Sequence, residues 1–133
     1  MSTVEWITAN DVSLTIIIRR EFEPQATQFI TADEHLQQIG FVKYPKGGTI
    51  PPHLHKPLER HIVGTPETLI VRSGRAEVSL YDDRQQLVAQ RTLEAGDVLV
   101  LISGGHGFRL LEDTVLLEVK QGPYTGLVEK ERF

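Results

Sequence analysis

The sequence predicts an all-β domain, an antiparallel sandwich or barrel, on the basis of three observations. Short runs rich in valine, isoleucine, leucine and threonine recur along the 133 residues. Most are bounded by glycine, proline, asparagine or aspartate, which is typical of strands joined by turns. Only residues 31–36 carry a signal for the start of a helix. We find no repeat or linker, so we expect one domain, residues 1–133, of many short strands.

The first third of the chain contains the clearest single strand. The β-branched run Val12–Ile18 follows a turn signal at Asn10 and Asp11. Residues 29–30 are expected to begin a strand, and residues 38–44 to form another. Between them, a capping box at residues 31–34 predicts one helical turn through Leu36.

The rest of the chain alternates between apolar runs and turn signals. A loop at residues 56–66 contains two prolines and is long enough to suggest a function. Ser73-Gly74 and residues 82–85 and 94–97 read as turns. We expect residues 108–111 to pair with 115–119. The predicted strands are residues 67–72, 75–81, 86–93, 98–102, 108–111 and 115–119.

The composition excludes several classes of function. The net charge of −4, with lysine and arginine scattered, argues against binding to nucleic acid. The absence of cysteine excludes disulfides, thiolate metal sites and cysteine nucleophiles. No apolar stretch approaches the roughly 20 residues that a membrane helix needs, and the start of the chain does not resemble a signal peptide. We therefore expect a soluble cytoplasmic protein without a membrane or nucleic-acid partner.

Histidines and a carboxylate point to a candidate metal site. His53 and His55 are two apart, so on a strand both imidazoles would point to the same face. Such a pair forms half of a metal site and requires a carboxylate and a further histidine. Glu67 opens a predicted strand, and His106 follows another.

These residues together resemble the motifs of the cupin superfamily. Gly47 or Gly48, with His53, His55, Glu67 and Gly74, match its first motif, with six residues between the glutamate and the final glycine. The second motif is matched by Gly96-Asp97, Gly104 and His106. The resemblance covers roughly residues 35–120 and implies a double-stranded β-helix, or jelly-roll barrel. The N-terminal strand and C-terminal tail would pack outside this core.

Two features of the sequence depart from the cupin pattern. Glu67 comes twelve residues after His55, which makes residues 56–66 an enlarged loop with its own Glu59 and His61. Glu59 therefore competes with Glu67 as the carboxylate, and we favour Glu67 because a strand holds a ligand more firmly than a loop. In the second motif, Ile102 replaces the usual proline and His106 comes one residue early.

The resemblance implies one divalent metal ion, Zn, Fe, Mn or Ni, bound by His53, His55, Glu67 and His106. The expected function is a metal-dependent isomerase or epimerase that acts on a small polar or sugar-related substrate, with Glu59 or His61 moving the proton. One alternative is a metal-free enzyme that resembles nucleotide-sugar isomerases and epimerases, with His53 or His55 as the base. An Fe(II) dioxygenase and a non-catalytic ligand-binding module are the others.

Two further expectations concern surfaces. The resemblance, together with apolar residues at Val4, Trp6 and 14–18, predicts a homodimer. Several charged residues on or beside strands could face either water or the interior. The alternation of residues along a strand does not decide which, because bulges shift the register. They are Lys43, Arg72, Arg75, Glu77, Arg109 and Lys120.

Overall fold

The computed structural model describes residues 2–123, 125–126 and 129–133, and these form ten β-strands and no helix. The all-β prediction is therefore confirmed. No helix in this part of the chain could span a membrane. The chain divides into two compact units, residues 1–22 with 65–133 and residues 23–64. We call them the sandwich unit and the insert unit and describe each by itself.

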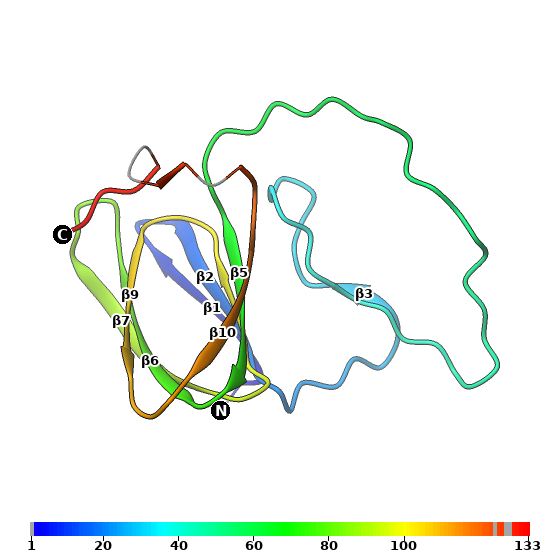
Figure 1. Cartoon of the computed structure of the whole chain (residues 1–133), viewed down its shortest axis with the longest axis horizontal. Coiled ribbons are helices and arrows are strands. Elements are labelled where there is room, and N and C mark those ends of the chain that lie inside the picture. Colours follow the sequence, from blue (N-terminus) through cyan, green and yellow to red (C-terminus); the bar gives the residue numbers. More distant parts are fainter. Residues whose placement is uncertain (1, 124, 127–128) are drawn as a thin grey trace. The chain divides into compact units, whose positions relative to one another are not determined.

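The sandwich unit consists of two antiparallel sheets (Figure 1). The five-stranded sheet has the order β1-β2-β8-β5-β10, with strands Val4–Ala9, Val12–Ile18, Val98–Leu101, Glu67–Ser73 and Val115–Lys120. The three-stranded sheet has the order β7-β6-β9, with strands Leu87–Glu94, Arg75–Tyr81 and Gly105–Leu110. The predicted strands Val12–Ile18 and Arg75–Tyr81 are observed with the same bounds.

The core lies between these two sheets because alternate residues of each strand point inward. The buried cluster contains Ile7, Ile17, Leu69, Val71, Leu99 and Leu101 from the larger sheet and Val78, Leu80 and Leu93 from the smaller. Strand β2 is buried on both faces, since each of its residues from Leu14 to Ile18 is at most 3% exposed. Those five residues offer little area to a partner subunit.

Two corners carry the chain from one sheet to the other. Strands β5 and β6 are separated only by Gly74, yet they belong to different sheets. The expected pairing of residues 108–111 with 115–119 is wrong, because β9 pairs with β6 while β10 pairs with β5. The corners contact each other, since the Arg75 amide donates to the Thr114 hydroxyl at 3.2 Å and the Leu111 amide donates to the Arg75 carbonyl at 2.9 Å.

The insert unit contains one short ladder, between β3 (Gln28–Phe29) and β4 (Gly40–Phe41). The predicted helical turn at residues 31–36 is wrong. Instead of capping a helix, the Thr31 hydroxyl accepts the Ile39 amide at 3.0 Å and donates to the Gln38 side chain at 3.1 Å. The strand expected at residues 38–44 is reduced to β4, and residues 42–66 contain no strand.

Candidate functional site

Glu67 points into the space between the two sheets. Leu69 and Val71 lie on the same face of β5 and belong to the buried core, so the alternation of the strand directs Glu67 to the interior. Glu67 is the first residue of β5 and lies where the core ends, because the inward-facing residues that follow it, Leu69 and Val71, are apolar and buried. Its side chain is 13% exposed.

His106 faces Glu67 from the opposite sheet. His106 pairs with Leu80 of β6, and Phe108, two residues further along the same face of β9, pairs with Val78. Leu80 and Val78 are both core residues. The Nε2 atom of His106 lies 3.8 Å from Oε1 of Glu67. This separation is too long for a direct hydrogen bond between the two groups.

Two charged residues of β10 complete the cluster. Lys120 pairs with Glu67 across the sheet, and Glu118 pairs with Leu69, so both share the inward face of Glu67. The Lys120 ammonium lies 3.2 Å from carboxylate oxygens of both Glu118 and Glu129. Its positive charge is therefore already compensated on two sides.

The surroundings favour the uncharged form of both central groups. Burial raises the pKa of Glu67, and the charge of Glu118 and a hydrogen bond that protonated Glu67 donates to the Glu118 carboxylate raise it further, while the charges of Lys120 and Lys130 lower it. Burial lowers the pKa of His106, while the charge of Glu118 opposes this effect. The pair thus shifts toward a protonated carboxyl group beside a neutral imidazole.

The other two predicted metal ligands belong to the insert unit. His53 and His55 lie outside any strand, so the expectation that a strand aligns them is wrong. Their rings are nevertheless close, with centroids 5.4 Å apart and planes at 68°. The Pro51 carbonyl lies 2.9 Å from His53 Nδ1. Since a carbonyl only accepts, Nδ1 donates the proton and Nε2 carries the free lone pair.

The four predicted ligands thus form two separate pairs, one in each unit. Within the described residues, no group of three or more histidine, aspartate or glutamate side chains could hold a metal ion. The complete set is not assembled in either unit. Each pair, however, presents nitrogen or oxygen donors of the kind that a divalent metal takes.

The remaining candidates are distributed over both units. Glu59 and His61 are exposed residues of the insert unit. Of the six charged residues left open by the sequence, Lys120 points inward. Glu77 and Arg109 instead pair with each other on the outward face of β6 and β9, while Arg72 and Arg75 are exposed. Lys43 belongs to the insert unit, where its ammonium donates to the Pro24 carbonyl at 2.7 Å.

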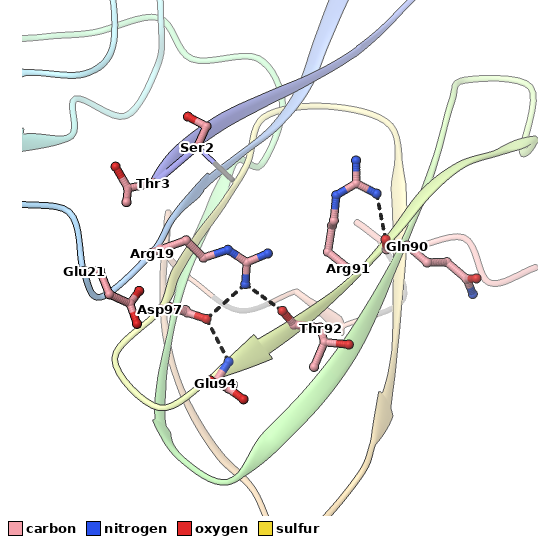
Figure 2. Close-up of a pocket in the computed structure, with 9 residues that line it drawn as sticks. All are labelled: Ser2, Thr3, Arg19, Glu21, Gln90, Arg91, Thr92, Glu94 and Asp97. Atoms are coloured by element: carbon pink, nitrogen blue, oxygen red, sulfur yellow. Dashed lines mark hydrogen bonds and ion pairs between the residues drawn. The ribbon is translucent and has the colours of Figure 1, made fainter.

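A separate pocket of about 560 Å³ lies beyond the other end of β8 (Figure 2). Its cations are paired within the protein. Arg19 donates to Asp97 at 3.2 Å and to the Thr92 carbonyl at 2.6 Å. Arg91 binds both carboxylate oxygens of Glu5, at 2.8 and 3.0 Å. We therefore interpret this region as a brace between strands rather than as a second active site.

Glu118 and Glu129 are members of the site that the sequence analysis did not single out. The alternation in β10, in which Leu116, Glu118 and Lys120 share one face and Leu117 and Val119 the other, is visible in the sequence. That signal alone does not show which face points inward. Glu129 lies outside any strand and joins the cluster only through tertiary contacts.

Comparisons with known proteins return no similar protein: no family model, curated protein or solved structure matches this chain.

Proposed function

We propose that the chain is an enzyme that moves a proton on a small polar substrate, with Glu67 and His106 as its acid–base pair. One observation carries this proposal: an inward-facing carboxyl group and an imidazole from opposite sheets lie 3.8 Å apart at the edge of the core. Displaced pKa values of such a pair are characteristic of groups that exchange protons with a substrate.

The two groups would divide the work of an isomerisation. His106 Nε2, neutral because burial lowers its pKa, takes a proton from a carbon next to a carbonyl group. Glu67, whose protonated form is favoured because burial raises its pKa, gives its proton to the carbonyl oxygen, which forms the enol. In an α-hydroxy carbonyl substrate, His106 returns its proton to the former carbonyl carbon while the other enediol hydroxyl loses its proton to Glu67, which completes isomerisation. Return of the proton to the opposite face of the original carbon, with the enol proton going back to Glu67, completes epimerisation.

The same residues support membership of the cupin superfamily as a proposal. Two antiparallel sheets that exchange strands through corners are the arrangement expected of a jelly roll. Glu67 and His106, taken from the two cupin-like motifs, point to the same space between the sheets. A sugar-related substrate fits a site that holds both a proton donor and a proton acceptor.

Deuterium exchange tests the reaction over many candidate substrates at once. A panel of sugar phosphates, nucleotide sugars and small keto acids is incubated with the protein in D₂O, and incorporation is followed by NMR. Glu67→Gln and His106→Gln should each slow incorporation by roughly 100-fold or more. Glu77→Gln and His35→Gln are matched controls that should retain the wild-type rate. Equal rates in all five proteins would refute the roles of Glu67 and His106.

Glu59 and His61 stay candidates for proton transfer. If the loop supplies the mobile proton, Glu59→Gln or His61→Gln should reduce incorporation in the same assay by about 100-fold. Unchanged rates in both variants would leave Glu67 and His106 as the acting pair.

The raised pKa of Glu67 also predicts how stability depends on pH. The folded protein holds this proton more tightly than the unfolded chain does. Below pH 4.5, Glu67 therefore does not lower the free energy of unfolding, and it lowers this free energy as the pH rises through its higher folded pKa. Glu67→Gln should therefore raise the melting temperature relative to wild type more at pH 8 than at pH 4.5. The comparison is made by thermal denaturation, and a difference that does not vary with pH would contradict the assignment.

Metal binding is the second candidate function, and the state of His53 favours it. The hydrogen bond of Nδ1 to the Pro51 carbonyl leaves Nε2 free to bind a metal, as in many histidine ligands. His53, His55, Glu67 and His106 would hold one Zn, Fe, Mn or Ni ion, which would polarise a substrate oxygen. Dioxygen chemistry at Fe(II) and simple ligand binding remain alternatives within this proposal.

Elemental analysis separates the two candidates. The purified protein should contain about one divalent metal ion per chain if the four residues bind it. The double variant His53→Ala with His55→Ala should lose that metal, whereas His61→Ala should keep it. Wild-type protein that stays metal-free after reconstitution near neutral pH would exclude the metal site and favour the acid–base enzyme.

A further inference from the structure

The described end of the chain, residues 129–133, crosses the end of the sandwich unit at which Glu67 and His106 lie. In Figure 1 this red segment follows β10 and reaches the side of β6 and β7. Its contacts connect three parts of the unit: β10, the start of β9 and the β6–β7 hairpin. We call residues 129–133 the strap.

One end of the strap is attached to β10. The carboxylate of Glu129 lies 3.2 Å from the Lys120 ammonium and accepts the Thr125 hydroxyl at 2.6 Å. Lys120 is the cross-strand partner of Glu67. Only 16% of the Glu129 side chain is exposed, and through Lys120 this attachment is connected to the strand position opposite Glu67.

The other end of the strap is attached to the opposite sheet. The Phe133 ring packs edge-on against Tyr81, with centroids 5.0 Å apart. It also lies on Gly105, where an added Cβ would come within 2.6 Å of the ring. Gly105 immediately precedes His106 in β9. Next to this contact, the Gln85 amide donates to the Glu131 carboxylate at 3.0 Å.

The middle of the strap is also close to the pair. Burial is the main influence on the pKa of both Glu67 and His106, but the charge of Lys130 reaches both groups as well. The contacts with Lys120, the cross-strand partner of Glu67, and with Gly105, which precedes His106, place the strap beside the pair. The aromatic contact and the exposed hydrogen bond that close it are each weak enough to open reversibly.

We propose that the strap is a gate that limits access to Glu67, whose side chain is 13% exposed, held closed by Phe133 on Tyr81 and Gly105 and by Glu131 on Gln85. Small molecules reach the pair when this end of the strap lifts, while Glu129 remains bound to Lys120 as the hinge side. This inference rests on the proposed function only for the identity of the gated groups, since access to them can be measured without any turnover.

Chemical labelling measures that access directly. A water-soluble carbodiimide with glycine ethyl ester labels carboxyl groups at mildly acidic pH, and peptide mass spectrometry gives the rate at Glu67. Phe133→Ala should raise this rate about fivefold, the size expected from loss of one aromatic contact. Arg132→Ala, at the exposed neighbouring position, should stay within about twofold of wild type because it leaves the closing contacts intact. Labelling at the exposed Glu112 provides the internal reference.

A cross-linked variant tests the gate in the opposite direction. Because the chain contains no cysteine, Gln85→Cys with Glu131→Cys introduces a unique pair of thiols that a short bis-maleimide can join. The linked protein should label at Glu67 about fivefold more slowly than the same variant before linking. If circular dichroism shows that Phe133→Ala does not fold, the labelling rates before and after cross-linking still test the gate.

The results separate the gate from the proposed reaction. Unchanged labelling in Phe133→Ala, an equal rise in Arg132→Ala, or no slowing after cross-linking would each overturn the gate. Absence of deuterium incorporation for every substrate would count against the reaction and leave these labelling rates unaffected.

Discussion

Asp97 shows how a single residue holds the turn before β8. It is 3% exposed, and its carboxylate accepts the Arg20 amide at 2.9 Å, the Glu94 amide at 2.8 Å and the Arg19 guanidinium at 3.2 Å. Figure 2 shows the contacts with Arg19 and Glu94 at the side of the pocket. A buried carboxylate with this set of donors connects β2, β7 and β8 at one point.

Loss of the Asp97 carboxylate should be strongly destabilising. Asp97→Ala leaves the mostly buried Arg19 without its ion pair and two amides without an acceptor, so we expect a loss of about 3 kcal/mol. Glu21→Ala is the control, because the exposed pair of Glu21 with Arg20 is worth at most about 0.5 kcal/mol. Urea denaturation measures both values, and similar losses in the two variants would contradict the role of Asp97.

At the scale of elements, Gly74 determines how β5 continues into β6. Its φ of 92° lies in the left-handed region, and an added Cβ would lie 2.3 Å from the Asp113 carbonyl oxygen. The chain therefore turns sharply while a second corner packs against it. Strands β5 and β6 lie in different sheets, so Glu67 on β5 and His106 on β9, the partner of β6, come from opposite sheets.

Replacing Gly74 with alanine tests the need for a left-handed backbone conformation and the close contact between the two corners. Gly74→Ala should cost about 3 kcal/mol or more, because backbone strain adds to a clash with backbone atoms. Gly47→Ala, at a similar φ of 86° but with no atom within 4 Å of the added Cβ, should cost only about 1 kcal/mol. Denaturation followed by circular dichroism gives both values, and equal costs would show that the corner contact is unimportant.

For the whole molecule, the expected homodimer has to use surfaces other than Leu14 to Ile18. The outward face of the five-stranded sheet still exposes apolar area at Trp6, which is 39% exposed, and at Leu117, which is 49% exposed. Their partners Ile16 and Ile70 place both on the same face. Trp6 and Leu117 lie on the two edge strands, and Ile16 and Val100 between them on this face are buried, so the apolar area open to a partner lies along the edges of the sheet.

Light scattering at micromolar concentration should give twice the chain mass of 15.0 kDa. Leu117→Glu should shift the mass toward the single chain, because a charge in an apolar interface is costly to desolvate. Leu87→Glu, at a comparably exposed apolar residue of the three-stranded sheet, should leave the mass unchanged. A wild-type mass of 15.0 kDa would exclude the dimer at that concentration.

The sequence by itself determined the strands and part of the site. Alternation and β-branching are local properties, so Val12–Ile18 and Arg75–Tyr81 could be located without tertiary information. Glu67 and His106 were chosen from their places in the two sequence motifs, and their role in a site stays a prediction. The helical turn at residues 31–36 failed because the Thr31 hydroxyl binds Ile39 and Gln38, in preference to capping a helix.

Only the tertiary structure decided which strands pair and which side chains point inward. Adjacent runs of sequence usually form hairpins, yet β9 and β10 join different sheets, since their corner packs against Gly74. The inward direction of Glu118 and Lys120 follows from the partners of β10, which lie far away in the sequence. The periodicity of a strand is a local property, whereas the sheet to which a strand belongs is decided by the burial of apolar residues over the whole unit. The cluster around Glu67 and His106 forms only after the strands have been assigned to their sheets.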